Sequence, residues 1–352
     1  MTAGTISRGS SQRSTGQKVA LGIGLILLAA LVAWVLFFAR GTPADPLISG
    51  ATDFSRAFLD ALTIAGLYFI VAAGFTLIFG LMRVVNLAHG SLFLLGGYVA
   101  LEFQKYLVGK GNFSSAEVSP GDWLLPLAMA AVVAGLIGLI IQQVFLRWFQ
   151  GQDMRETLIT IAISVILADQ MVAIFGGLAK DIKWPGFIDG FIEIGSFRYS
   201  QTRLFMLFIA IVVGVALWAW LQKTRTGMVI RAGVDDTSMV QALGINVQVV
   251  FALAFLVGSA LAGIGGVIGG SFAALGSGVD GNWLLNSIIV VIVGGMGSLM
   301  GAAAGSLMLG VVTAFAPAYL PANFTHYSVI FTFVLLAAVL AWRPYGLFGR
   351  PE

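Results

Sequence analysis

Long apolar stretches separated by short polar segments dominate this chain. An apolar helix needs about 20 residues to cross the hydrocarbon layer of a bilayer. Stretches of that kind lie near residues 19–39, 57–81, 123–146, 157–177, 203–221, 249–274, 299–316 and 326–342. Two further apolar stretches, 90–104 and 283–297, are shorter and indicate short or broken segments. The pattern predicts an all-α integral membrane protein with about ten transmembrane segments.

The first apolar stretch has two interpretations. It follows a polar, basic segment over residues 1–18, as the apolar core of a secretory signal does. Its length exceeds the roughly 7–15 apolar residues of a typical signal peptide. We therefore expect residues 19–39 to be a retained membrane anchor and residues 1–18 a cytoplasmic tail. The alternative is cleavage, which would leave nine spans.

Composition supports a membrane environment for the rest of the chain. Of the 352 residues, 59% are hydrophobic and 10% are charged, and the mean hydropathy is +0.96, whereas soluble domains have about 25% charged residues. The absence of cysteine excludes disulfides and thiolate metal sites, and two histidines leave little for any other metal site. The basic residues are scattered between apolar runs, so we expect no nucleic-acid partner.

The distribution of charge predicts the topology. With the N-terminus inside, eleven of the 19 Lys and Arg residues fall in cytoplasmic segments, as the positive-inside rule favours. Ten spans then place both termini in the cytoplasm. Residues 178–202 become an external loop with a short hairpin, because Pro, Gly and alternating apolar residues mix there. Residues 222–248 become the longest internal loop, within a transmembrane domain over residues 40–352.

That internal loop predicts a short helix on the cytoplasmic face. Asp or Thr can cap a helix start, and Gly suits its end. A helix resting on lipid headgroups would carry bulky apolar residues on one face and Lys or Arg on the other. This helix instead carries acids and small residues, which favours a groove on a protein partner over the lipid surface. The candidate docking residues are Asp235, Asp236, Met239, Ala242, Leu243 and Gly244.

Four blocks of this sequence resemble one protein family. The loop from Asp236 to Gly244 is similar to the coupling-helix motif of bacterial ABC importer permeases. Residues 66–100, with Asn86, Ala88, His89 and Gly90 in the pattern N-x-A-H-G, resemble the first conserved block of branched-chain amino-acid permeases. VGGMGSLMGAAAGSLMLG at 293–310 and WRPYGLFGR at 342–350 resemble the same family. Together the blocks extend over almost all of the chain from residue 57 onward.

The resemblance implies a permease subunit of an ATP-driven importer, with the ABC importer permease fold and pseudo-repeated halves. It implies a second permease, two ATPase subunits docked on residues 231–244, and a periplasmic substrate-binding protein. ATP and Mg²⁺ would be bound by the ATPase subunits, with no cofactor on this chain, which is not itself an enzyme. The chain would reside in a bacterial inner membrane. The implied cargo is a branched-chain amino acid; urea, short amides or other small carboxylates are alternatives.

Glycine-rich runs predict close helix packing. The run at 293–310 is not a phosphate loop, because such a loop needs a Lys and a Ser or Thr after its last Gly. Small residues at a spacing of four lie on one helix face and let membrane helices approach. We assign this packing role to Gly265, Gly269, Gly297, Gly301 and Gly305.

Four polar residues are candidates for a substrate pathway. Asn86, His89 and Ser91 lie beside the break between two apolar stretches, and an interrupted helix can place polar groups in a cavity. Alternatively, Asn86 caps the next segment and His89 satisfies backbone groups at the break. Asp169 is an acid near the middle of the predicted span 157–177. A carboxylate there must face the bundle interior, pair with another group or be protonated, and it serves either substrate recognition or an interhelical hydrogen bond.

The main rival hypothesis is a secondary transporter or channel driven by an ion gradient. Such proteins carry networks of acids and bases within the membrane. The isolation of Asp169 counts against it.

Overall fold

A computed structural model describes residues 51–109, 113, 117–194, 197–320, 325 and 327–349. The predicted tail over residues 1–18 and the predicted anchor over residues 19–39 lie outside the described residues. Most of the described part is helical, which confirms the expected all-α class.

Six described helices are long and apolar enough to cross a membrane. Five are single α-helices, and the sixth joins α4 to a π-helical turn η1 and a 3₁₀ turn η2. They are α2 (Ala51–Met82), α4 (Gly121–Ile140) with η1 (Ile141–Phe145) and η2 (Leu146–Phe149), α5 (Asp153–Phe175), α6 (Gln201–Lys223), α9 (Val247–Phe272) and α11 (Leu299–Tyr319). All six full-length apolar stretches predicted between residues 57 and 316 form these helices.

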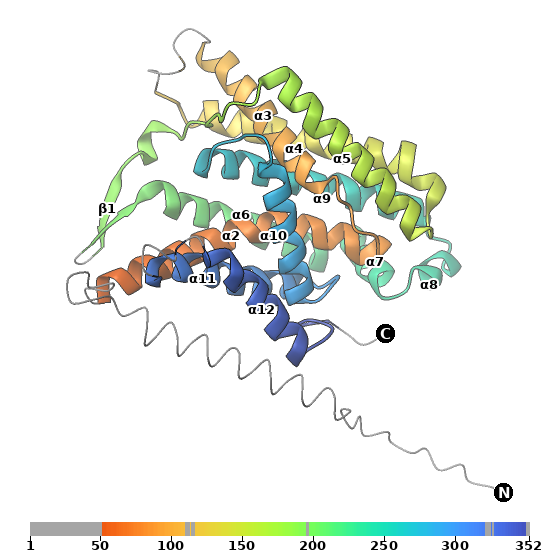
Figure 1. The fold of residues 1–352 in the computed structure, drawn as a ribbon. Helices are drawn as coiled ribbons and strands as arrows, with labels where there is room; N and C mark the ends of the chain where they lie inside the picture. Colours follow the sequence, from red (N-terminus) through yellow and green to blue (C-terminus); the bar gives the residue numbers. More distant parts are fainter. Residues whose placement is uncertain are drawn as a thin grey trace, which may run out of the picture.

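Three further helices complete the bundle. They are α3 (His89–Val108), α10 (Val279–Gly294) and α12 (Ser328–Trp342). The two short stretches predicted as broken segments form α3 and α10. Figure 1 shows α10 crossing the view steeply to α2, α6 and α11 rather than running alongside them. With 16 residues, or about 24 Å, α10 is shorter than the roughly 30 Å hydrocarbon layer of a bilayer.

The centre of the bundle is formed by α2 and α9. Helix α2 packs against α6, α9, α10 and α11, and α9 packs against α3 and α4 as well. Glycine makes these contacts close: a Cβ added at Gly74 would lie 2.4 Å from the carbonyl oxygen of Gly258. Gly265 and Gly269 face Val71 and Phe93, so the predicted packing of this helix is confirmed.

One glycine of the later run packs closely, against Gly80 of α2, but does not lie on the helix face predicted for it. Gly301 and Gly305 lie within α11 and contact α10, where an added Cβ would meet backbone atoms of Gly294 at 2.4 Å and of Val290 at 2.4 Å. Gly297 instead lies in the turn before α11, with φ of +78°, a conformation in which side chains are strained. The chain bends there, so Gly297 shares no helix face with the other two.

The two ends of the bundle carry different elements. At one end, β1 (Phe191–Ile194) and β2 (Phe197–Ser200) form an antiparallel hairpin after the 3₁₀ turn η3 (Gly186–Ile188), which confirms the hairpin predicted in residues 178–202. At the other end lie α7 (Arg225–Asp235) and α8 (Thr237–Ala242) (Figure 1). The expected short helix is α8. The sequence did not predict α7, because Gly227 and Gly233 weaken the helical signal of residues 225–235.

Candidate functional site

The connection between α2 and α3 turns back into the bundle. The imidazole Nε2 of His89, at the start of α3, donates to the backbone carbonyl of Val71 at 3.0 Å. Val71 precedes the end of α2 by eleven residues, or about 16 Å of helix. Residues 83–88 therefore run back along α2 before α3 begins, as the orange trace in Figure 1 shows.

This turn accounts for two of the predicted pathway residues. His89 is fully buried, and Asn86 is 2% exposed. The Asn86 side-chain oxygen accepts from the backbone N–H of Ala88 at 3.1 Å, a local turn contact. The His89 contact matches the backbone-satisfying alternative, but the predicted capping by Asn86 was wrong, because α3 begins after Ala88 without a side-chain cap. In this structure, neither side chain faces an open surface.

Helix α5 supplies the polar partners of the returning segment. The backbone N–H of Leu87 donates to the Thr160 hydroxyl at 3.3 Å. One turn further along α5, the hydroxyls of Ser164 and Ser91 lie 2.8 Å apart. The four-residue spacing places Thr160 and Ser164 on one face of the helix. Irregular backbone within a membrane requires such partners.

The start of α10 meets the start of α3 at the same place. An added Cβ at Gly90 would lie 2.4 Å from the carbonyl oxygen of Asp280. The Asp280 carboxylate lies 3.5 Å from the Ser91 hydroxyl. Neither α3 nor α10 has a side-chain cap at its start, so the backbone N–H groups there keep their partial positive charge. These two helix starts lie beside the hydroxyls of Ser91 and Ser164 and the half-buried carboxylate of Asp280. This junction has both charge signs needed to hold a small zwitterion.

Asp169 lies on the exposed side of α5. Of the three alternatives given for this carboxylate, the single chain does not show burial in the interior, because Asp169 is exposed. Ile161 and Val165 precede it at intervals of four and are also exposed. A carboxylate on such a face costs about 2.5 kcal/mol or more against lipid. Contact of this face with another protein or with a water-filled passage would remove that cost.

The loop at the opposite end has the capping geometry expected from the sequence. The Asp236 carboxylate accepts from the backbone N–H groups of Ser238 and Met239, at 2.9 Å and 3.1 Å. The Ser238 hydroxyl and these amides hold the pKa of Asp236 below its usual range. Gly244, with φ of +79°, ends the α8 turn. The cap and the terminating glycine are thereby confirmed.

The same loop exposes apolar side chains. Met239 is 62% exposed and Leu243 is 72% exposed, and Ala242 beside them is exposed too. Asp235 is the last residue of α7. Few charged groups separate these apolar residues, so the surface suits burial against a protein.

A groove of about 440 Å³ lies beneath α7 and α8. Arg83, in the left-handed region at φ of +58°, lines it together with Glu156, Asp235 and Asp236. Glu156 is 1% exposed, and its Oε2 has no hydrogen-bond partner. The sequence pointed to the two aspartates only. Arg83 and Glu156 join them because the end of α2 and the start of α5 meet here.

Other site residues were also missed by the sequence reasoning. Thr160 and Ser164 lie four apart on an apolar span, and that spacing was a usable signal. Asp280 follows a glycine-rich stretch, and no local pattern links it to Ser91, which lies 189 residues away in the chain.

Comparisons with known proteins agree with this architecture. A family described as "Branched-chain amino acid transport system / permease component" matches residues 57–340. LivH of Escherichia coli K12, a high-affinity branched-chain amino acid transport system permease protein, is 30% identical over 85% of this chain and 96% of its own length. BraD of Pseudomonas aeruginosa, with the same description, is 28% identical over 84% of this chain and 96% of its own length.

A second type of permease is also similar to the chain. LivM of Escherichia coli K12, another high-affinity branched-chain amino acid transport system permease protein, is 23% identical over 96% of this chain and 76% of its own length. No solved structure matches the chain. The match over residues 57–340 and the helical bundle lead to one conclusion: this multi-pass membrane protein belongs to the family of branched-chain amino acid transport system permease components.

Proposed function

We propose that this protein is the membrane-spanning permease subunit of an ATP-driven importer for branched-chain or closely related amino acids. The observation that carries the proposal is the surface of α7 and α8, where capped, exposed apolar positions adjoin a charged groove at one end of the bundle. ATPase subunits with bound ATP and Mg²⁺ dock on residues 231–244. Their movement is transmitted through α7 and α8 to α2 and α9, against which α7 packs.

The exposed face of α5 packs against a second permease and lines the passage between the two. Of the six long spans, α5 is the least buried, with 11% of its apolar window inside the structure. LivH and LivM are two permease proteins from one organism that share a system description, which supports a heterodimer. The passage then contains Asp169, Ser164 and the junction at Asp280.

These groups fit an amino acid with an apolar side chain. The Asp169 and Asp280 carboxylates suit an ammonium group, the start of α3 suits a carboxylate, and exposed Ile161 and Val165 suit a branched apolar side chain. The chain resides in a bacterial inner membrane with both termini in the cytoplasm. A periplasmic binding protein delivers the substrate at the end bearing β1 and β2.

Reconstitution tests this function. The chain, a second permease, the ATPase subunits and the binding protein are placed in liposomes, and uptake of labelled leucine, isoleucine and valine is measured. We expect uptake that requires both ATP and the binding protein. Calorimetry on the binding protein identifies the cargo, with urea and short amides as comparison ligands. Uptake by this chain alone, driven by an applied ion gradient, would show a secondary transporter and refute the proposal.

Replacing Asp169 with asparagine tests the passage. Loss of a charge-assisted hydrogen bond is worth about 1.5–3 kcal/mol, so we expect the maximal uptake rate to fall by about tenfold or more at saturating binding protein. Gln170→Leu, on the neighbouring residue, is the control, and its rate should change little. An Asp169→Asn rate equal to that of the unaltered protein would remove Asp169 from the passage.

A further inference from the structure

The end of the bundle opposite to α7 and α8 carries a second set of charged residues. It is built from the first turns of α2, the β1–β2 hairpin and the start of α6 (Figure 1). In the proposed orientation this end faces the periplasm. None of these residues belongs to the passage or to the coupling surface.

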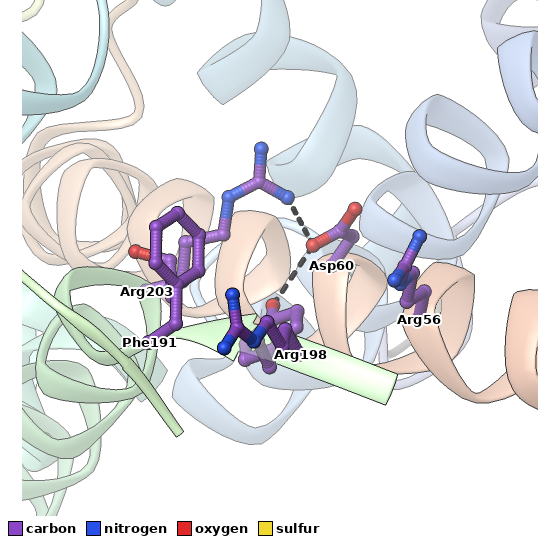
Figure 2. Close-up of a pocket in the computed structure, with 7 residues that line it drawn as sticks. Arg56, Asp60, Phe191, Arg198 and Arg203 are labelled. Carbon is purple, nitrogen blue, oxygen red and sulfur yellow. Dashed lines mark hydrogen bonds and ion pairs between the residues drawn. The ribbon is translucent and has the colours of Figure 1, made fainter. Parts of the chain in front are cut away.

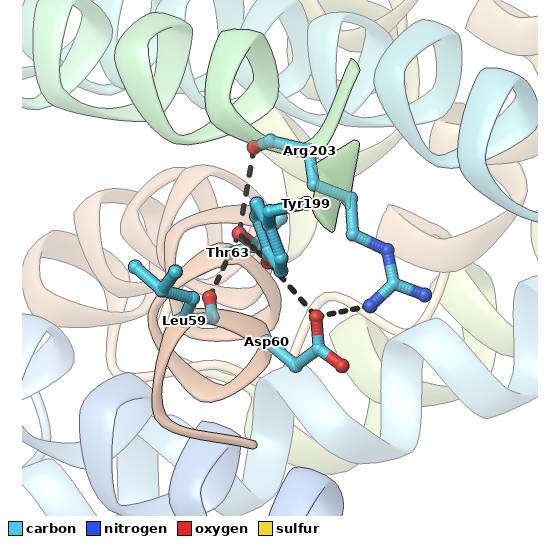
Figure 3. A network of polar contacts seen from close by, with 5 residues as sticks. All are labelled: Leu59, Asp60, Thr63, Tyr199 and Arg203. Atoms are coloured by element: carbon cyan, nitrogen blue, oxygen red, sulfur yellow. Dashed lines mark hydrogen bonds and ion pairs between the residues drawn. The ribbon is translucent and has the colours of Figure 1, made fainter. Parts of the chain in front are cut away.

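A buried tyrosine fixes the geometry of this end. Tyr199 is 4% exposed, and its hydroxyl donates to the Asp60 carboxylate at 2.8 Å. The Arg203 guanidinium donates to the same carboxylate oxygen, and the Thr63 hydroxyl lies 3.3 Å from that of Tyr199 (Figure 3). Burial raises the pKa of Tyr199 to about 12, so it stays neutral and keeps donating at physiological pH. Asp60 is therefore already shared by two donors.

A pocket of about 430 Å³ opens over this network. Figure 2 shows the guanidinium groups of Arg56, Arg198 and Arg203 arranged around Asp60. Three arginines and one carboxylate line the pocket, and the Glu193 carboxylate pairs with Arg198 just outside it, so the arginines outnumber these carboxylates by one. The remaining lining residues are Phe191, Tyr199 and Ser200.

Two of the arginines lie at an accessible rim. Arg56 is exposed, and the Arg198 side chain is 72% exposed. Arg198 pairs with Glu193 at 3.2 Å, but Glu193 is 73% exposed and lies outside the lining. Exposed ion pairs contribute about 0–1 kcal/mol, so another carboxylate can replace Glu193 at little cost.

We propose that this pocket is a docking point for acidic side chains of the periplasmic binding protein. The proposal rests on the function above and names residues of this chain that would receive that partner. Arginine is suited to the role, because its planar guanidinium binds a carboxylate through two parallel hydrogen bonds. Asp60 and Tyr199 hold Arg203 in place, and Arg56 and Arg198 supply the charge that attracts the partner.

The position favours a protein over the transported amino acid as the occupant. The pocket lies between the hairpin and the helix starts, whereas the passage groups lie at the junction of α3, α5 and α10. Exposed rim charges increase the rate of encounter between proteins and their specificity. A folded partner can present two carboxylates, one to each rim arginine, whereas an amino-acid substrate has a single carboxylate.

Titration of the binding protein in the reconstituted transporter tests the proposal. Arg56→Gln and Arg198→Gln each remove one rim charge, and we expect the half-maximal concentration of substrate-loaded binding protein to rise about fivefold. The maximal uptake rate should stay unchanged. Raising the salt concentration should increase the half-maximal concentration in the unaltered protein and increase it less in the double variant.

Lys105→Gln is the matched control. Lys105 lies near the end of α3, pairs with Glu102 and is outside the pocket, so its removal should leave the half-maximal concentration unchanged. An unchanged value in the double arginine variant, with normal uptake by the unaltered protein, would overturn the docking proposal alone. So would a defect that persists at saturating binding protein, because it would assign the pocket to the substrate. Absence of any binding-protein-dependent uptake in the unaltered protein would overturn the proposed function as well.

Discussion

Gly244→Arg is expected to abolish ATPase-driven uptake while the protein still inserts into the membrane. Gly244 ends the α8 turn with φ of +79°, and nothing lies within 4 Å of an added Cβ. The added side chain therefore meets no neighbour, although the left-handed backbone at this position strains any residue with a Cβ. If residues 231–244 are the proposed docking surface, the new charge would be buried against the ATPase without a partner. Such a group costs about 2–5 kcal/mol, which corresponds to a loss of about 30-fold or more in coupled uptake.

Gly244→Asn separates this effect from backbone strain. Asparagine tolerates the left-handed conformation better than other side chains, and it adds no charge. We expect near-normal uptake from Gly244→Asn. Membrane-fraction abundance gives insertion, and copurification of the ATPase subunits gives docking for both variants. Normal coupled uptake by Gly244→Arg would refute the assignment of residues 231–244 as the docking surface.

Gly266→Val is expected to prevent formation of a stable bundle. An added Cβ at Gly266 would lie 1.9 Å from the carbonyl oxygen of Phe93 and 2.9 Å from the backbone nitrogen of Gly97. Both neighbours are backbone atoms of α3, so no side chain can rotate to make room. Helices α3 and α9 must separate, which we expect to cost about 3 kcal/mol or more. Thermal unfolding in detergent measures the loss.

A graded series makes this prediction specific. Gly266→Ala already places the first clashing atom and should lower the unfolding temperature, with Gly266→Val lowering it further. Gly177→Val adds the same side chain where nothing lies within 4 Å, and we expect little change from it. Equal stability of Gly266→Val and Gly177→Val would show that α3 and α9 are not packed as closely as described.

The predicted residues differ in how far their positions depend on nearby residues in the sequence. The capped start and the glycine end of the short helix α8 were predicted correctly, because capping and the left-handed turn depend on residues only two or three positions away. Gly297 was misplaced, since the spacing of four was counted through a turn that is set by contact with Gly80 in α2. The side of Asp169 was left open among three alternatives, because one span alone does not reveal which of its faces the remaining helices cover.

The sequence by itself determined the membrane environment, the helical class, the positions of the spans from residue 57 onward and the capped turn at α8. These follow from hydropathy over about 20 residues and from local hydrogen bonding, neither of which needs distant contacts. Tertiary structure alone decided that residues 83–88 return into the bundle, that Ser91, Ser164 and Asp280 meet, and that Arg56, Asp60 and Tyr199 form one pocket. Each of these joins residues far apart in the chain, and helix packing fixes such distances, which no local pattern encodes.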